Sequence, residues 1–126
     1  MRLNQLTIPV SDIPRSKSFY QRLGFRLLVD SPHYSRFLAP QGDTTFSLHL
    51  TPEPVVPGAV IYLECDALDD EVTALQAEGF EFETEPADMS WLWREANLRD
   101  PDGHLIKLYH GGVNRIDPPW RVKPEA

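Results

Sequence analysis

The chain of 126 residues lacks several features that mark particular classes of protein. It has a single cysteine, Cys65, so it cannot form an internal disulfide, and this favours a reducing compartment. It has no run of basic residues, and 12 Lys and Arg stand against 19 Asp and Glu, which argues against a nucleic-acid partner. No apolar stretch is long enough for a signal peptide or a membrane span, so we expect a cytoplasmic protein with no membrane partner.

What the chain does have is the composition of a globular protein. Hydrophobic residues make up 41% of it and aromatic residues 10%, which are ordinary values. Its length fits one domain, or two half-size modules that share a core. The formal charge of −7 favours a cationic or neutral small ligand over an anionic one.

Two stretches of the chain share one pattern, and they begin about 55 residues apart. They are Val10–Phe25 (VSDIPRSKSFYQRLGF) and Cys65–Phe80 (CDALDDEVTALQAEGF). Each follows a strand-like run, passes through an acidic helix cap, carries apolar residues at helical spacing and closes on Gly-Phe. The pattern indicates two copies of one strand–helix–strands unit, although the low literal identity makes it evidence of shared architecture only.

Apolar alternation and turn residues divide both copies into short strands. The predicted strands are residues 3–10, 25–30, 34–39, 44–50, 59–65, 80–84, 93–99 and 104–110. Ser11 or Asp12 is expected to cap the first helix, and Gly24 to end it in a left-handed conformation. The second helix is expected near 69–78, with Asp66 or Asp69 as its cap.

The proline pattern sets the predicted organisation. Residues 1–52 form the first module, and residues 53–58 form a Pro-rich linker. Residues 59–111 form the second module, so that one domain covers 1–111. Residues 112–126 are a Pro-rich tail, in which Trp120 either docks on the body or lies in a disordered segment.

The motifs FYQRLGF in the first half and LRDPDGHLIKLYH near the end, with their order and the internal repeat, resemble the vicinal oxygen chelate superfamily. This is the glyoxalase, bleomycin resistance protein and dioxygenase group, and the resemblance covers about residues 3–110. It implies an α+β fold of two βαβββ modules whose sheets curve around a shared cavity, often completed by dimerisation. We therefore expect a homodimer. Members of the group include metal-dependent enzymes and metal-free drug-binding proteins, so the fold does not fix the function.

The resemblance also implies four positions for metal ligands. In this sequence they fall on Gln5, on Ser47 or His49, on Val60 and on Lys107. Valine has no donor atom and an ammonium group repels a divalent cation, so we expect no metal cofactor. Gln5 and His49 would be the ligands if a partial site exists, and a shifted site could add Glu64.

Other residues are candidates on grounds of their own chemistry. Alternation places Trp91, Trp93 and Glu95 on one strand face, where two indole rings suit stacking on a planar or cationic ligand. An aromatic dimer interface or a cavity plug is the structural alternative. The predicted ligand-binding residues are Gln5, Thr7, Tyr62, Trp91, Trp93, Lys107 and Tyr109.

The ionisable residues carry the weaker catalytic hypotheses. His49 could be a general base, with Glu64 as a second catalytic group, although Glu64 also fits a strand-end carboxylate that is either solvated or paired with a nearby Arg. Lys107 needs a partner if it is buried, and Glu64 is a candidate. The remaining predictions are an exposed His33 and His104, a rim position for His110 and a small buried side chain for Cys65.

The sequence therefore favours a metal-independent protein of the glyoxalase and bleomycin-resistance type that binds a small aromatic or amphipathic molecule. The first alternative is a glyoxalase-type lyase or isomerase with a divalent metal at a partial or shifted site. The second is an interaction module whose cavity is filled by Trp91 and Trp93.

Overall fold

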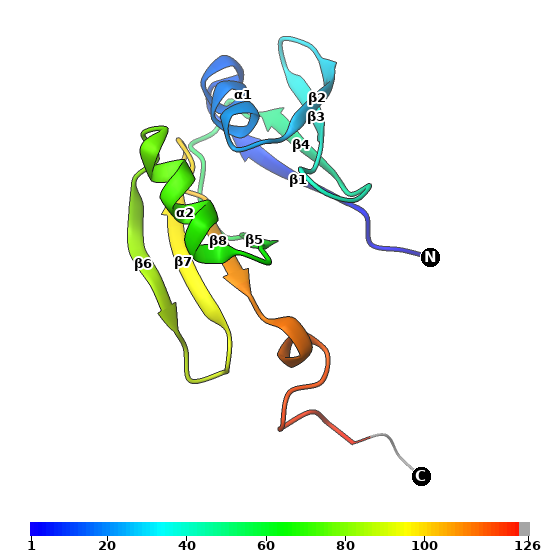
Figure 1. Cartoon of the computed structure of the whole chain (residues 1–126). Helices are drawn as coiled ribbons and strands as arrows, with labels where there is room; N and C mark the ends of the chain where they lie inside the picture. Colours follow the sequence, from blue (N-terminus) through cyan, green and yellow to red (C-terminus); the bar gives the residue numbers. More distant parts are fainter. Residues whose placement is uncertain (124–126) are drawn as a thin grey trace. The chain divides into compact units, whose positions relative to one another are not determined.

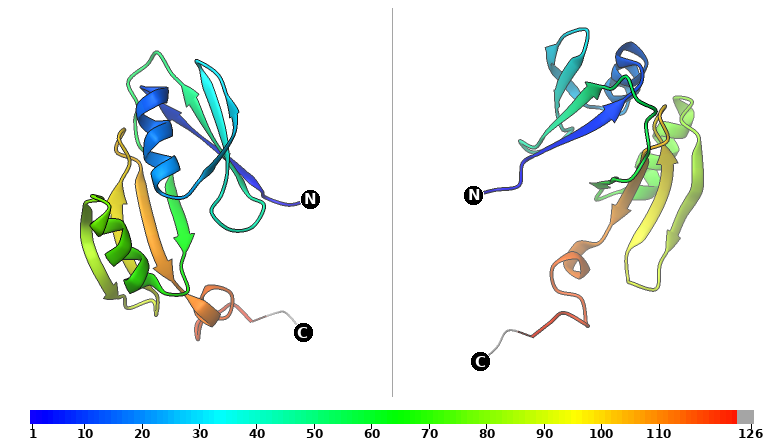
Figure 2. Two further views of the ribbon diagram at one scale, coloured as in Figure 1. Left: turned by 45° about the horizontal axis from the view of Figure 1, so that its top comes forward. Right: turned by 180° about the vertical axis from the view of Figure 1, so that it is seen from behind.

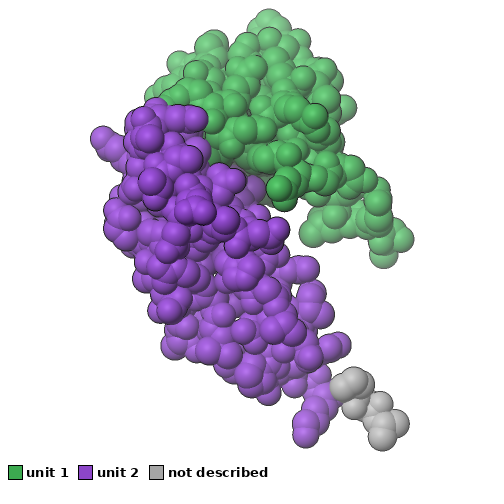
Figure 3. Space-filling model, viewed as in Figure 1, with its two compact units in different colours: residues 1–59, 100–104 green, residues 60–99, 105–126 purple. Residues whose placement is uncertain are grey.

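The computed structural model of the protein describes residues 1–123, and its elements follow one another as two similar sets (Figure 1). Contacts divide the chain into two compact units (Figure 3). The first unit contains residues 1–59 together with 100–104, and the second contains residues 60–99 together with the chain from 105 onward. The turn at 100–104 therefore joins two strands of the second unit but makes its contacts in the first.

The first unit is a four-stranded sheet with one helix. Its elements are β1 (Gln5–Val10), α1 (Ile13–Arg22), β2 (Arg26–Asp30), β3 (Tyr34–Leu38) and β4 (Thr45–Leu50). The strand order is β1-β4-β3-β2, in which β1 and β4 are parallel and the other pairs are antiparallel. Figure 2 shows α1 lying across one face of this sheet.

Aromatic side chains fill the core between α1 and the sheet. Tyr20 on α1 is fully buried, and its ring centroid lies 4.7 Å from that of Phe46 on β4. Phe25 and Phe37 complete the cluster. Such rings bury much apolar surface and gain from edge contacts, so this cluster forms a large part of the core of the unit.

The ends of α1 follow from single residues. Asp12 is the N-cap, and its Oδ1 accepts a hydrogen bond from Arg15 N at 2.9 Å. Ser11, the other predicted cap, is engaged instead with Asp102, to which both its backbone N and its hydroxyl donate. Gly24 follows the helix with a φ of 110°, which confirms the predicted left-handed stop.

The turn at 100–104 is a buried polar structure. Tyr20 donates its hydroxyl proton to Asp100 Oδ2 at 2.6 Å, and Asp100 Oδ1 accepts from the backbone N of Asp102 and of His104. His104 is 1% exposed, with Nε2 lying 2.8 Å from the carbonyl oxygen of Pro9. The prediction of an exposed His104 is therefore wrong, because the turn folds inward and its ring satisfies a carbonyl of the edge strand. His33 is exposed, as predicted.

The second unit repeats the first. Its elements are β5 (Val60–Glu64), α2 (Leu68–Ala77), β6 (Phe82–Asp88), β7 (Arg94–Arg99) and β8 (Leu105–His110). The order β5-β8-β7-β6, with β5 and β8 parallel, is the order of the first sheet. The predicted α+β fold of two βαβββ modules is confirmed.

Two boundaries in the second unit differ from the sequence prediction. The N-cap of α2 is Ala67 and no side chain caps it, since Asp69 lies within the first turn and pairs with Arg94 at 2.8 Å. β6 was expected at 80–84 but runs from Phe82 to Asp88, with two irregularities in its pairing to β7. Phe80 is instead buried directly after the helix.

The remaining segments carry little regular structure. Residues 51–58 form no strand or helix, and a 3₁₀ helix (η1, Gly112–Arg115) follows β8. Trp120 remains 57% exposed, and residues 124–126 of the predicted tail lie outside the described residues. No helix within residues 1–123 has the length and apolar character needed to cross a membrane.

Candidate functional site

Each sheet has one face under its helix and one face turned away from it. On the first sheet the face opposite α1, here called the polar face, carries Gln5, Thr7, Arg26, Tyr34, Arg36, Thr45, Ser47 and His49. On the second sheet the face opposite α2, here called the aromatic face, carries Tyr62, Glu64, Glu95, Asn97, Lys107 and Tyr109, and the ring of Trp93, directly before β7, packs on it. All the predicted ligand-binding residues except Trp91 lie at positions on these two faces.

Hydrogen bonds connect the side chains of the polar face across three strands. Gln5 Nε2 donates to Ser47 Oγ at 3.1 Å, and Ser47 Oγ lies 2.7 Å from the hydroxyl oxygen of Tyr34. Arg36 Nε donates to the same hydroxyl at 2.8 Å, and Thr45 donates to Gln5 Oε1 at 2.6 Å. These bonds hold the five side chains in one arrangement without a carboxylate.

Ser47 and His49, the two alternatives that the sequence left open, both lie on the polar face. Ser47 pairs directly with Thr7 in the β1–β4 ladder, is fully buried and bonds to Gln5. His49 points to the same face one row further along and is exposed. The position beside Gln5 is therefore occupied by a hydroxyl, while a catalytic role for His49 stays a prediction.

Tyr34 has an unusual electrostatic environment. Burial by itself would raise the pKa of its phenol, but the hydrogen bonds with Ser47 and Arg36 and the nearby guanidinium charge lower the pKa below its ordinary value. The Arg36 guanidinium carbon also lies 5.4 Å from the centre of the Tyr34 ring. The phenol oxygen is thus surrounded by donors and positive charge.

Three rings form the centre of the aromatic face. Trp93 stacks on Tyr109 with centroids 4.6 Å apart and planes 23° apart. Tyr62 meets both rings edge-on, at 6.1 Å from Trp93 and 5.6 Å from Tyr109. Tyr62 is 50% exposed whereas Tyr109 is 6% exposed, so the cluster has a buried base and an accessible edge.

The indole of Trp93 is also fixed by the segment that follows β8. Its Nε1 donates to the carbonyl oxygen of Asn114 at 3.2 Å. Gly111 passes so close that a Cβ there would lie 3.1 Å from the same nitrogen, so a side chain at this position would displace the ring. Trp93 therefore has a structural role in addition to any contact with a ligand.

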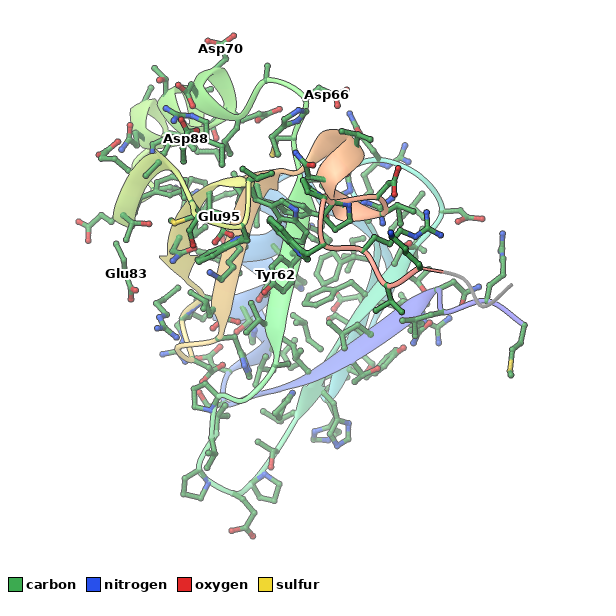
Figure 4. The ribbon with its side chains drawn as sticks, turned by 90° about the horizontal axis from the view of Figure 1, so that it is seen from below. Tyr62, Asp66, Asp70, Glu83, Asp88 and Glu95 are labelled. Atoms are coloured by element: carbon green, nitrogen blue, oxygen red, sulfur yellow. The ribbon has the colours of Figure 1, made fainter. Side chains whose placement is uncertain are left out.

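A buried ion pair lies beside the rings. Lys107 Nζ lies 2.8 Å from Glu95 Oε1, and the Glu95 side chain is only 2% exposed. Trp91 lies in the turn before β7 and donates its indole N–H to Glu95 Oε2. The expected partner of Lys107 exists, but it is Glu95 and not Glu64, because the β7–β8 register places Glu95 on the diagonal from Lys107. Figure 4 shows Glu95 and Tyr62 on the second sheet.

Glu64 is engaged at the end of β5. Its Oε2 accepts hydrogen bonds from the backbone N of Gly111 and Gly112, at 3.0 and 3.2 Å, and Arg115 lies 3.5 Å from its Oε1. This matches the structural interpretation of Glu64 as a strand-end carboxylate paired with an arginine. Burial first, and then the Glu64 charge, raise the pKa of the neighbouring Tyr109.

The two faces correspond position by position. Tyr34 and Ser47 lie on a diagonal between β3 and β4, and Glu95 and Lys107 lie on the same diagonal between β7 and β8. In each sheet, the two side chains on this diagonal bond to each other and so connect neighbouring strands. The first module has two hydroxyl groups on this diagonal, and the second has an ion pair.

The donor set does not fit the metal site that the resemblance implies. Ser47 occupies the position beside Gln5, Val60 offers no donor, and the ammonium of Lys107 is held by Glu95. Within residues 1–123 no three side chains of His, Cys, Asp or Glu gather in a group that could hold a metal ion.

A separate hollow of about 270 Å³ lies at the start of α2. Its lining includes Asp66, Asp69, Asp70, Arg94 and His110. Arg94 is held by Asp69 and by Asp88, so it pairs with one of the three aspartates of the lining. Asp66 and Asp70 are labelled in Figure 4 away from Tyr62 and Glu95. The hollow contains none of the predicted ligand-binding residues.

Comparison with known proteins places the chain in a family. It belongs to the Glyoxalase/Bleomycin resistance protein/Dioxygenase superfamily, whose model matches residues 2–108. No curated protein sequence matches the chain closely enough to count as a relative.

Several solved structures resemble this fold. A member from Sphaerobacter thermophilus is 27% identical with a TM-score of 0.73, covering 87% of this chain and 97% of its own. A member from Nocardioides is 22% identical with a TM-score of 0.79, covering 98% and 90%. A bleomycin-binding protein in complex with bleomycin is 23% identical with a TM-score of 0.71, covering 89% and 99%.

Sequence reasoning missed several residues of the two faces. Tyr34 and Arg36 were not singled out, although they alternate on the predicted strand 34–39 and so share a face. Glu95 was placed on the face of the tryptophans but not paired with Lys107. Alternation along the strand could have identified these residues, because residues two apart share a face. It needed to be applied to every polar residue and not to the tryptophans alone.

Proposed function

We propose that this protein binds a small aromatic or amphipathic molecule, with the aromatic face of its second sheet as the principal contact and without a metal ion. The observation that carries the proposal is the cluster of Tyr62, Trp93 and Tyr109, whose accessible edge is the half-exposed Tyr62 ring. Flat rings held in place offer large contact area at little cost in side-chain entropy. The likeness to a bleomycin-binding protein supports the fold of such a binder and leaves the ligand open.

The charges beside the rings are already compensated. Lys107 is paired with Glu95, and Glu64 with Arg115 and two backbone N–H groups. A ligand that stacks on the rings therefore meets a surface with little free charge. This favours recognition by shape and stacking over recognition by a single ion pair on the second sheet.

Binding can be tested by calorimetry with three planar probes of similar size. These are 1-methylquinolinium, naphthalene-2-carboxamide and naphthalene-2-carboxylate. We expect saturable binding of at least one probe. We also expect Tyr62→Ala to weaken that binding by roughly 1–3 kcal/mol, because it removes the accessible ring of the cluster. A matched control is Trp120→Ala, which removes an exposed ring of the tail.

The outcomes separate the alternatives. Binding by the wild-type protein that Tyr62→Ala weakens and Trp120→Ala does not supports the proposal. No binding of any probe contradicts it and favours the interaction module, in which the rings only pack. Binding that requires an added divalent metal contradicts the proposal of binding without a metal ion, and it favours the glyoxalase-type lyase or isomerase.

A further inference from the structure

The polar face of the first sheet carries an uncompensated positive charge in an acidic chain. Six of the other arginines form ion pairs with carboxylates: Arg2, Arg15, Arg94, Arg99, Arg115 and Arg121. Arg26 and Arg36 form none with any carboxylate in residues 1–123. No strand position on this face is occupied by Asp or Glu. The polar face is therefore positively charged, whereas the whole chain has a formal charge of −7.

The two arginines lie on one face of neighbouring strands. Arg26 on β2 is directly opposite Leu38 on β3, and Leu38 is two residues from Arg36. Residues two apart on a strand share a face, so Arg26 and Arg36 are diagonal neighbours. Long side chains on such a diagonal can reach the same group.

The guanidinium of Arg36 is held in a fixed position. Its Nε donates to the Tyr34 hydroxyl at 2.8 Å, and its plane lies near the Tyr34 ring. Its two terminal nitrogens have no hydrogen-bond partner in residues 1–123. They form a two-pronged donor of the kind that grips carboxylate and phosphate oxygens.

Further donors surround this fork. When Ser47 donates to the Tyr34 oxygen, that oxygen accepts from both Ser47 and Arg36, and the phenol proton is free for a ligand. The lowered pKa of Tyr34 reflects the same positive surroundings. Beyond the arginines, His49 and Tyr34 are the titratable side chains on this face, and neither is a carboxylic acid.

We propose that the polar face of the first sheet is an oxyanion-binding site, in which Arg36 and Arg26 hold a carboxylate or phosphate group and Tyr34 positions Arg36. The site involves residues of the first sheet alone, and it goes beyond the proposed function. The site itself can be tested with small anions alone. It reverses the preference for a cationic or neutral ligand that net charge suggests.

The experiment follows the Nε–Hε signals of the arginine side chains in ¹⁵N-labelled protein. The titrants are sodium acetate, inorganic phosphate and sodium chloride at constant ionic strength. We expect a saturable shift of the Arg36 signal with acetate or phosphate and not with chloride. The stronger of the two anions identifies the group. Equal, unsaturable shifts with all three salts would overturn the proposal, and this result needs no variant.

Variants then locate the site. We expect Arg36→Gln to weaken anion binding at least tenfold, and Tyr34→Phe to weaken it roughly two- to tenfold by freeing the guanidinium. The matched control is Arg2→Gln, an exposed arginine of the same unit that is paired with Asp43. Equal binding by wild type and a folded Arg36→Gln would also overturn the proposal.

The two proposals fail in different ways. If naphthalene-2-carboxamide binds in a Tyr62-dependent manner while no anion shifts Arg36, the proposed function stands and the oxyanion site is wrong. If acetate or phosphate binds at Arg36 while none of the planar probes binds, the oxyanion site stands and the aromatic contact is wrong.

Discussion

Lys107 Nζ and Glu95 Oε1 lie 2.8 Å apart, and the Glu95 side chain is 2% exposed whereas that of Lys107 is 18% exposed. Because Glu95 is the more buried of the two, loss of Lys107 costs more free energy than loss of Glu95 would. A buried charge without compensation is costly, whereas a pair replaced as a whole need not be.

We therefore expect Lys107→Met to lower the free energy of unfolding by about 3–5 kcal/mol, because it leaves Glu95 charged in a buried place. The double variant Lys107→Met with Glu95→Gln should recover most of the loss, since the amide oxygen can still accept from Trp91. The measurement is urea unfolding. Lys17→Met, which breaks a more exposed pair with Asp30, should cost less than about 1 kcal/mol. Equal effects at Lys107 and Lys17 would contradict this account of the pair.

The thiol of Cys65 gives stability a dependence on alkaline pH. Burial first, and then the charges of Glu71, Glu64 and Asp66, raise its pKa from 9.0 to about 11. Between these values the unfolded chain has lost the thiol proton and the folded chain retains it, so the free energy of unfolding falls as pH rises. The contribution is fully present below pH 9.

Urea midpoints measured from pH 8 to pH 11 test this prediction. The Cys65→Ala variant should show a shallower decline than the wild-type protein, because it lacks the titrating thiol. The decline that remains is expected from Tyr20, whose pKa is raised by burial and by Asp100. Parallel curves for the two proteins would show that the thiol titrates alike in both states.

Features that depend on residues close together in the sequence could be predicted from it, whereas contacts between strands mostly could not. Strands such as β1 and β4 were predictable because each buries one face and alternates accordingly. The partner of Lys107 was not predictable, because the β7–β8 register depends on how the turn at 100–104 folds. The burial of His104 was missed for the same reason, since a turn sequence rich in Asp, Pro and Gly normally lies in solvent.

The polar face shows the same limit. The uncertainty between Ser47 and His49 arose from the length of the segment between β3 and β4, which parity alone does not fix. The lack of a carboxylate partner for Arg26 and Arg36 within residues 1–123 could not be predicted from the sequence, because it depends on which side chains lie nearby in space. The role of such a residue depends on its neighbours in space, so it could be recognised only in the structure.

Metal content is a further expected outcome. We expect the protein, purified after expression in metal-supplemented medium, to contain no stoichiometric Zn, Ni, Mn or Fe. The reason is that Val60 and Lys107 stand at two of the positions that the sequence resemblance assigns to metal ligands, and Lys107 is paired with Glu95. Elemental analysis checks this. One metal ion per chain that is lost on Gln5→Ala would establish the metal-dependent alternative.

Edge strands suggest self-association. β1 and β5 are edge strands of their sheets, and Leu6 and Val60 on them are each 39% exposed. Unpaired strand edges with apolar side chains are commonly covered by a partner. We expect a homodimer of about twice the 14.4 kDa chain mass in sedimentation at micromolar concentration. A monomer at all concentrations would contradict this expectation.

The central claim is that the rings of the second sheet contact a ligand, and the indole N–H signals of ¹⁵N-tryptophan-labelled protein test it most directly. Trp91, Trp93 and Trp120 give three signals, each assigned by a Trp→Phe variant. A planar ligand stacked on the cluster changes the ring current at Trp93, so its signal should shift saturably with naphthalene-2-carboxamide or 1-methylquinolinium while that of Trp120 stays in place. If all three signals stay in place, or if only Trp120 moves, the aromatic face is a packing element and not a binding surface.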